Sequence, residues 1–328
     1  MFKAAVVGCG MIGGMYEDVH SVQTYSHGKA YYEQNEISEI AFTDNHPERA
    51  SSLAEKFKGV AYTDLSSLLK EFRPDCISVC TPDDNHFDAI QQILTEGDSV
   101  RLIFAEKPVV STRDELEKIQ CLLEKSNVEI IVHHNRRFDS AHQNLKYIIQ
   151  NEELGKFIQG HIDYYGGWCH LGVHIIDVLQ YFFEEPLIPG KMRYACSSKY
   201  PKDPTLHVDA EIAGGKIHMF GMDEALYQIV DINLKFETGQ IKINDFGQEI
   251  LVFRKTINKE QENVLIPDPD YKEKGMVSPI KNAIELIVDY LRSSNKNMLK
   301  PVGIQQAEIT MNTLWNGVQL YEAQSQKS

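Results

Sequence analysis

Residues 169–182, with the sequence CHLGVHIIDVLQYF, carry ionisable side chains on a segment that is otherwise apolar. If the segment is helical, a rotation of about 100° per residue places His170, His174 and Asp177 within about 60° of one another. Ionisable groups on an apolar helix need hydrogen-bond or ion-pair partners or a functional role, because leaving one desolvated and unpaired costs several kcal/mol. These side chains therefore form either a satisfied structural cluster or part of a chemical site.

A second chemical pattern lies near the N-terminus, in the stretch AVVGCGMIGG. Gly8, Gly10 and Gly13 have GxGxxG spacing at the end of an apolar strand, with Met11 and Ile12 between the last two glycines. The first glycine permits a tight turn, the second lets a pyrophosphate approach the backbone, and the third lets helix and strand pack closely. Because a strand precedes the turn and a helical pattern follows it, the motif predicts a dinucleotide-binding site.

Asp44 ends the second expected strand, where a carboxylate can accept hydrogen bonds from the adenosine ribose and repel a 2′-phosphate. It therefore favours NAD over NADP. Asp44 lies 31 residues after Gly13, whereas about 20 is usual. The extra length is in residues 17–27, which we interpret as an insertion at the mouth of the site, in a position to touch substrate or a neighbouring subunit.

The chain of 328 residues is longer than one compact core usually holds, so we expect about two domains. Its 33 Lys and Arg against 47 Asp and Glu give a formal net charge of −14, which argues against nucleic-acid or anionic-membrane partners. No apolar run approaches the roughly 18 residues that a membrane helix needs. The six cysteines form no CxxC pair, which favours reduced thiols in the cytoplasm.

The N-terminal part alternates short apolar runs with helical patterns, which predicts a doubly wound α/β domain with a parallel sheet at residues 1–125. Its strands are expected at residues 3–8, 39–44, 76–81, 101–107 and 129–134.

After about residue 150, strand patterns follow one another, and two helices close the chain, from about residue 279 and near residues 304–324. We predict an α+β domain at residues 126–328, with one large, mostly antiparallel open sheet and a C-terminal helix able to pack back on the first domain. Residues 257–275 are expected to be a mobile connection. The strands are expected at residues 157–165, 191–200, 206–213, 216–222, 227–236, 239–245 and 249–256.

The sequence resembles the Gfo/Idh/MocA family of sugar oxidoreductases over nearly its full length. The resemblance rests on five motifs in the family's order: GCGMIGG (8–14), TPDDNHFDAI (81–90), AEKP (105–108), HNRRF (134–138) and GVHIIDVL (172–179). It implies a Rossmann domain that binds NAD(P), followed by an α/β domain whose open sheet often mediates oligomers. A homodimer or homotetramer through the C-terminal sheet is therefore expected.

The resemblance also implies roles for individual residues. Glu106 and Lys107 would end a strand facing the reacting carbons, with Lys107 holding a substrate oxygen through its positive charge, and a cis peptide is expected before Pro108. The residues expected to flank the nicotinamide ribose are Thr81, Pro82, Asn85 and His86.

His174 is the expected acid–base group, because the histidine of the GxHxxD motif faces substrate in the family. Asp177 would fix its orientation or cap a neighbouring helix. Many relatives carry an aspartate where this chain has His170, so His170 itself is an alternative base. His170, His174 and Asp177, here called the stripe, could also hold Zn²⁺, but no further ligand is evident and we expect no metal. Expected substrate contacts are Arg136, Tyr164, Tyr165 and Trp168.

The function implied is hydride transfer between NAD and a secondary alcohol or ketone of a sugar, polyol or nucleotide-sugar derivative. Two alternatives stay open. One is a glycoside hydrolase that retains NAD and oxidises its substrate transiently, and the other is a non-catalytic regulator that binds dinucleotide.

Overall fold

The computed structural model describes residues 1–200, 202–271 and 273–326. The chain forms two compact units. Unit 1 comprises residues 1–138 and 278–308, and unit 2 comprises residues 139–277 together with the chain from residue 309 onward. This division differs from the boundary expected between residues 125 and 126, because the sheet of unit 1 gains its last strand after that point and a returning segment covers it.

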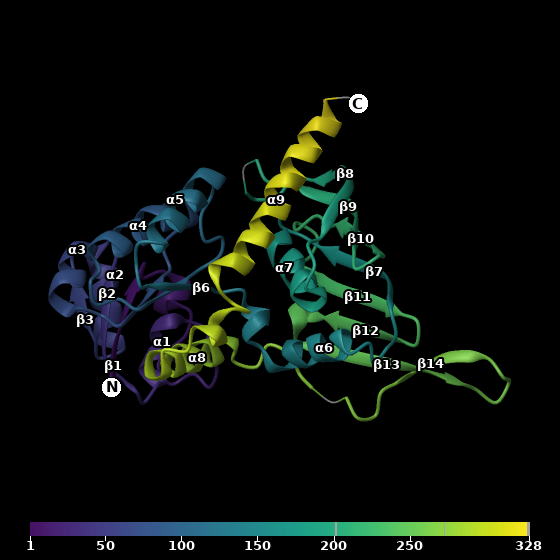
Figure 1. The fold of residues 1–328 in the computed structure, drawn as a ribbon, viewed down its shortest axis with the longest axis horizontal. Coiled ribbons are helices and arrows are strands. Elements are labelled where there is room, and N and C mark those ends of the chain that lie inside the picture. Colours follow the sequence, from purple (N-terminus) through teal and green to yellow (C-terminus); the bar gives the residue numbers. More distant parts are fainter. Residues whose placement is uncertain (201, 272, 327–328) are drawn as a thin grey trace. The chain divides into compact units, whose positions relative to one another are not determined.

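Unit 1 contains a six-stranded sheet in the order β3-β2-β1-β4-β5-β6, with every pair parallel (Figure 1). This is the doubly wound Rossmann order, so the predicted fold of this part is confirmed. Strands β4 and β5 are buried along their whole length, which explains their continuous apolar sequences, CISV and LIFA. The strands are β1 (Phe2–Val7), β2 (Ile37–Thr43), β3 (Val60–Tyr62), β4 (Cys76–Val79), β5 (Leu102–Ala105) and β6 (Glu129–Val132).

Helices cover this sheet. Helix α8 packs against α1, and its residues Ile280, Ile284 and Ile287 are buried in one apolar core with Val6 and Phe42 of the sheet. That core explains why the returning segment belongs to unit 1. The helices are α1 (His27–Glu33), α2 (Pro47–Lys56), α3 (Leu65–Ser67), α4 (His86–Glu96), α5 (Arg113–Leu123) and α8 (Pro279–Ser293). Short helical turns are η1 (Met11–Met15), η2 (Leu68–Phe72), η3 (Asp83–Asn85), η4 (Asn135–Phe138) and η6 (Lys296–Leu299).

Unit 2 contains an eight-stranded sheet in the order β14-β13-β12-β11-β7-β10-β9-β8, in which only the β7–β10 pair is parallel among the described residues. Alternate residues of β11 and β12 are buried, so one face of the sheet carries the core. The mostly antiparallel sheet was predicted and is confirmed. The strands are β7 (Phe157–Tyr164), β8 (Ile188–Cys196), β9 (Thr205–Ile212), β10 (Gly215–Gly221), β11 (Val230–Phe236), β12 (Gly239–Asn244), β13 (Glu249–Ile257) and β14 (Asn263–Pro267).

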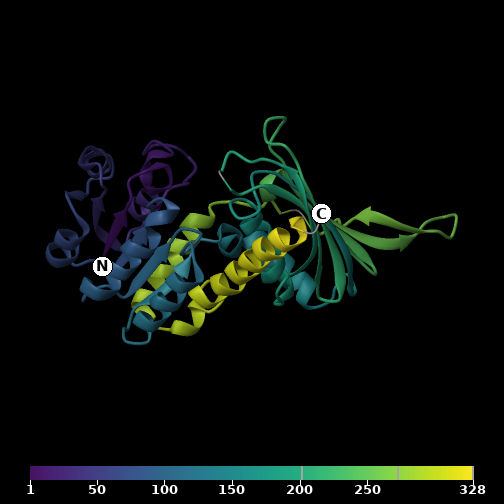
Figure 2. The same ribbon diagram turned by 90° about the horizontal axis from the view of Figure 1, so that it is seen from above.

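Strand β14 was not predicted. Residues 257–275 were expected to be a mobile connection, but residues 263–267 pair with β13 and form an extended hairpin (Figure 2). Helices α6 (Ser140–Gln150) and α7 (Gly172–Phe183) pack against each other, and α9 (Ile304–Ser325) adds Met311 and Leu314 to the core of unit 2. Among the described residues, no helix combines the length and apolar character needed to traverse a bilayer.

Replacing Gly13 with alanine should destabilise unit 1, because a Cβ there would lie 2.1 Å from the carbonyl oxygen of Gly8. We expect the free energy of unfolding to fall by about 1–3 kcal/mol. Gly10→Ala is the matched control, since a Cβ at Gly10 meets nothing within 4 Å. Urea unfolding followed by circular dichroism measures both. Equal urea midpoints for the two variants would contradict this account of the turn.

Candidate active site

The glycine turn after β1 lies directly against the end of β4. Gly8 has a φ of 93° in the left-handed region, and a Cβ there would lie 2.6 Å from the carbonyl carbon of Cys80 and the backbone nitrogen of Thr81. Only a residue without a side chain permits this approach. The space beside Gly10 is open, so backbone N–H groups of the turn can be reached by a ligand.

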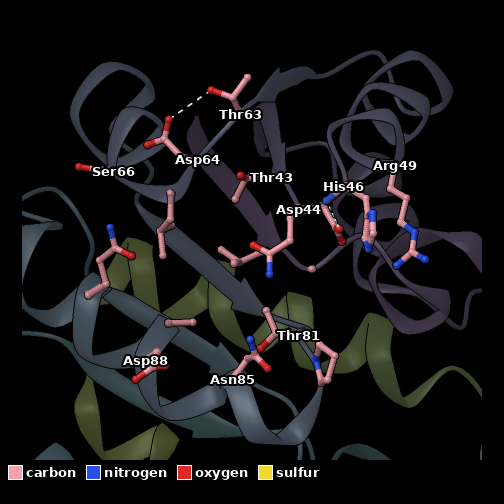
Figure 3. Close-up of a pocket in the computed structure, with 17 residues that line it drawn as sticks. Thr43, Asp44, His46, Arg49, Thr63, Asp64, Ser66, Thr81, Asn85 and Asp88 are labelled. Atoms are coloured by element: carbon pink, nitrogen blue, oxygen red, sulfur yellow. Dashed lines mark hydrogen bonds between the residues drawn. The ribbon is translucent and has the colours of Figure 1, made fainter.

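A cavity of about 460 Å³ opens beyond the ends of β1, β2 and β4 (Figure 3). Ligands of open α/β sheets bind in this place, outside the carboxyl ends of the strands where the strand order reverses. The cavity is lined by Val7, Gly8, Thr43, Asp44, Asn45, His46, Arg49, Thr63, Asp64, Leu65, Ser66, Thr81, Pro82, Asn85, Asp88, Ala89 and Gln92.

Asp44 lies on the wall of this cavity, at the end of β2. One carboxylate oxygen accepts a hydrogen bond of 2.6 Å from the Cys9 N–H, and the other accepts one of 2.8 Å from the His46 N–H. Figure 3 shows the side chains of His46 and Arg49 beside Asp44. Burial, together with the Asp44 charge, raises the pKa of the Cys9 thiol to about 12, so this thiol stays protonated under the turn.

The loop after β4 forms the opposite wall, through Thr81, Pro82 and Asn85. The Thr81 hydroxyl is buried and has no hydrogen-bond partner among the described residues. A buried polar group in this condition is uncommon in folded proteins and points to a partner that the chain itself does not supply.

His86, predicted to flank the nicotinamide ribose, contacts two loops and holds them together. Its Nδ1 lies 2.6 Å from the carbonyl oxygen of Pro108, and its Nε2 lies 2.8 Å from that of Thr81. The ring is fully buried. Carbonyl oxygens only accept hydrogen bonds, so a ring nitrogen of His86 that carries hydrogen donates to the carbonyl it faces. The structure places His86 behind the loop rather than in the cavity lining.

Glu106 lies at the end of β5 in a buried cluster with two histidines. Its Oε1 lies 2.9 Å from Nε2 of His27 and 2.6 Å from Nδ1 of His133. Nδ1 of His27 lies 2.8 Å from the Ser78 hydroxyl, which is 2.9 Å from the hydroxyl of Tyr31. With neutral rings, all these contacts are satisfied when both histidines donate to Oε1, Ser78 donates to His27, and Tyr31 donates to Ser78.

Electrostatics at this cluster favour an ionised Glu106 carboxylate. Burial opposes charge on Glu106, but the charge and hydrogen bond of His133 and those of His27 hold its pKa well below the usual range. Burial lowers the pKa of His27, against the opposing effect of Glu106. Among the described residues, this trio is the only group of histidine, cysteine and carboxylate side chains with the spacing of a metal site.

Lys107 follows Glu106, is half-buried, and is joined to Pro108 by the expected cis peptide bond. Burial lowers the pKa of its ammonium group, while the negative charges of Glu106 and Asp83 raise it. Because burial removes part of its hydration shell, the Lys107 ammonium group can present its positive charge directly to an oxygen atom of a ligand.

In unit 2, the stripe is only partly helical. Helix α7 begins at Gly172, so His170 lies in the preceding turn, where its ring stacks on Tyr200 with 3.6 Å between ring centroids. His174 is half-buried in the first turn of the helix. Asp177 is 1% exposed and accepts a hydrogen bond of 3.1 Å from Thr310 of α9. The helix therefore turns its aspartate toward α9.

The candidate substrate contacts fall into different environments. Tyr164 and Trp168 are core residues of unit 2: the Tyr164 hydroxyl donates to the Leu206 carbonyl, and the Trp168 ring N–H donates to the Leu314 carbonyl. Tyr165 is half-buried, and Arg136 is buried within η4 of unit 1. Aromatic residues at a strand end have the same sequence pattern whether they pack in a core or line a site.

The expected insertion is an anchored loop, and its last residue, His27, begins α1. The Glu17 carboxylate accepts hydrogen bonds from the backbone N–H groups of Tyr25 and Ser26. The fully buried Lys29 ammonium donates to the carbonyl oxygens of Ser21 and Gln23. The loop is therefore preformed beside the glycine turn.

Comparison with known proteins agrees with this geometry. Residues 2–134 match the model of an oxidoreductase family with an NAD-binding Rossmann fold, Gfo/Idh/MocA. The uncharacterised oxidoreductase YhhX of Escherichia coli is 28% identical over 139 residues, which cover 38% of this chain and 39% of that protein. The D-glucoside 3-dehydrogenase of Escherichia coli is 21% identical over 206 residues, covering 57% of this chain and 55% of that protein.

A similar fold extends over nearly the whole chain. A 3-ketoreductase from Actinomadura kijaniata, solved in complex with NADP, has a TM-score of 0.73 and 14% identity, covering 98% of this chain and 97% of that protein. The turn, cavity and sheet of unit 1 thus have the arrangement of a dinucleotide-binding Rossmann domain. Over residues 2–134, the chain is similar to the Gfo/Idh/MocA family of oxidoreductases.

The stability of unit 1 should fall as the pH is lowered from about 7 to about 5. The lowered pKa of His27 means that the unfolded chain binds more protons below the ordinary value of 6.5 than the folded chain does. The expected slope is at most about 1.4 kcal/mol per pH unit. His27→Gln, which has no titrating ring, should lose this component. Urea unfolding at a series of pH values measures the difference, and parallel profiles for the two proteins would refute it.

Proposed function

We propose that the protein is an NAD-dependent oxidoreductase acting on a secondary alcohol or ketone of a sugar, polyol or nucleotide-sugar derivative. The observation that carries the proposal is the cavity of Figure 3, where the glycine turn, Asp44 and the unsatisfied Thr81 hydroxyl converge. Bound NAD would accept the hydride from the alcohol, or NADH would supply it to the ketone. The D-glucoside 3-dehydrogenase among the relatives supports a carbohydrate substrate.

The residues of unit 1 fit a dinucleotide. The open space at Gly10 would admit a pyrophosphate to the N–H groups of the turn, where Gly8, Met11, Ile12 and Gly13 complete the backbone. The Asp44 carboxylate would accept hydrogen bonds from ribose hydroxyls. Thr81, Pro82 and Asn85 would bound the cofactor on the other wall.

Lys107 is the proposed group that holds the substrate oxygen, because a half-buried cation stabilises negative charge as it develops there. His174 or His170 is proposed to exchange the hydroxyl proton. Asp177 is a weaker candidate for orienting His174, since its carboxylate is bound to Thr310. Arg136 stays a proposed substrate contact, whereas the core positions of Tyr164 and Trp168 favour a structural role.

Two further proposals concern the setting of the enzyme. We propose a homodimer or homotetramer through the eight-stranded sheet, whose face opposite the core presents Phe220 stacked on His161. We also propose a cytoplasmic location with no nucleic-acid or membrane partner, supported by the six free cysteines and the net charge of −14.

The function is tested by incubating the protein with NAD⁺ and a panel of myo-inositol, D-glucose and methyl glucosides while NADH absorbance is recorded. We expect net NADH formation, and a loss of about 100- to 1,000-fold in kcat for Lys107→Met because the charge on the oxygen is lost. Lys125→Met, at an exposed lysine, is the matched control. His170→Asn and His174→Asn in the same assay show which ring carries the proton.

Other outcomes of this assay have definite meanings. Cleavage of a methyl glucoside without net NADH formation would favour the NAD-retaining hydrolase. NAD binding with no chemistry on any sugar, unchanged by Lys107→Met, would overturn the enzymatic proposal in favour of a regulator.

Asp44→Ser should shift cofactor preference toward NADP. The substitution removes a negative charge beside His46 and Arg49, which could then face a 2′-phosphate. Fluorescence titration with NADH and NADPH should show the ratio of the two dissociation constants changing at least about tenfold, or 1.4 kcal/mol. Asp88→Asn, on another wall of the same cavity, is the control. A wild-type preference for NADPH would count against Asp44 as the selecting residue.

A further inference from the structure

Lys107 lies between Glu106 and Pro108, and each of these two residues is hydrogen-bonded by histidines from other elements. On its N-terminal side, one oxygen of the Glu106 carboxylate is hydrogen-bonded by His27 of α1 and by His133, which follows β6. Two donors that reach one oxygen from different elements fix the position of that oxygen. The backbone N–H of Glu106 also donates to the carbonyl oxygen of Val79 on β4, at 3.0 Å.

On the C-terminal side, a third histidine holds the backbone. His86, the first residue of α4, contacts the carbonyl oxygen of Pro108 at 2.6 Å and that of Thr81 at 2.8 Å. The segment that carries Lys107 is thereby tied to the loop that forms one wall of the cofactor cavity. His27 and His86 are fully buried and His133 is 7% exposed, so solvent does not compete for these contacts.

We propose that His27, His133 and His86 are positioning residues that fix the place of Lys107. The catalytic role of Lys107 rests on the function proposed above, whereas the contacts that hold its neighbours do not depend on that function. Holding the residues on both sides of Lys107 confines the backbone from which its side chain extends. A catalytic group needs such confinement, because a displacement of about 1 Å can lower a rate about 100-fold.

The same atoms could be interpreted as ligands of a divalent cation, since His27, Glu106 and His133 offer atoms that all lie within 4.8 Å of one another. The hydrogen-bonding pattern favours positioning instead. Both ring nitrogens that face Glu106 are used as donors to its oxygen, and a cation would have to displace both protons. Nδ1 of His27 then accepts from Ser78, which fixes the tautomer of its ring.

Two substitutions at His133 separate the hydrogen bond from the packing. His133 lies in an aromatic cluster with Phe104 and Phe138, at centroid distances of 5.1 and 6.0 Å. His133→Phe keeps an aromatic ring in this cluster and removes the donor. His133→Asn removes the ring but carries an amide N–H where the Nδ1 donor stood.

Hydrogen–deuterium exchange of the full chain without substrate tests the proposal. We expect the backbone amides of residues 105–107 and 109 to exchange about tenfold faster in His133→Phe than in His133→Asn. The reverse order would assign His133 to packing and overturn the proposal. If His133→Phe does not fold, the pair His27→Phe and His27→Gln makes the same comparison from the other side of Glu106, since glutamine can place a donor where Nε2 stood.

Activity and metal content complete the test. On the sugar that gives NADH in the panel above, kcat of His133→Phe should fall at least about tenfold and stay below that of His133→Asn, with KM for NAD⁺ unchanged. If no sugar is turned over, the function fails, but the exchange result still decides whether residues 105–109 are held. One equivalent of bound metal in the purified protein, lost in both His133 variants, would overturn positioning in favour of a metal site.

Discussion

The parallel pairing of β1 with β2 on one side and with β4 on the other is the constraint on which the rest of unit 1 depends. It brings the carboxyl ends of three strands to one edge, where Gly8 must pass within van der Waals reach of Cys80 and Thr81. A side chain at Gly8 would force this edge apart. The cavity, the position of Asp44 and the unsatisfied Thr81 hydroxyl all follow from that approach.

The same edge contains two environments with different chemistry. One is the open cavity, whose wall is formed by backbone groups, Asp44 and short polar side chains suited to a ligand with many hydroxyl groups. The other is the buried cluster beside Lys107, where Glu106 is charged and one of its oxygens is contacted by His27 and His133. Low polarity around this cluster strengthens each hydrogen bond. The Glu106 charge would be costly if it were unpaired, but with these hydrogen bonds it holds the surrounding side chains in place.

The sequence predicted the features that depend on local spacing. The glycines, Asp44 and the apolar strands of unit 1 are read from neighbours a few residues apart, and the structure has the predicted sheets. Strands β3 and β14 were missed because both are short, mostly exposed edge strands with little apolar periodicity. His170 was predicted to be helical, but α7 begins two residues later, and the apolar pattern does not mark that start.

The buried cluster was beyond single-sequence reasoning for a different reason. His27 and Glu106 are separated by 79 residues, and Glu106 and His133 by 27, so only the folded sheet brings them together. Tyr164 and Trp168 were predicted to contact substrate because aromatic residues near polar ones suggested a site, and the structure buries both in the core of unit 2. His133 did carry a signal, because it directly follows a strand at the edge where ligands bind.

The discontinuous composition of unit 1 has a consequence for biosynthesis. Helix α8 leaves the ribosome only after all the strands of unit 2, yet Ile280, Ile284 and Ile287 complete the core around Val6 and Phe42. Until then, the apolar face that α8 will cover is exposed on the nascent chain. The N-terminal unit therefore cannot finish folding in order of synthesis, and this interval is when the polypeptide is most open to aggregation or to capture by a chaperone.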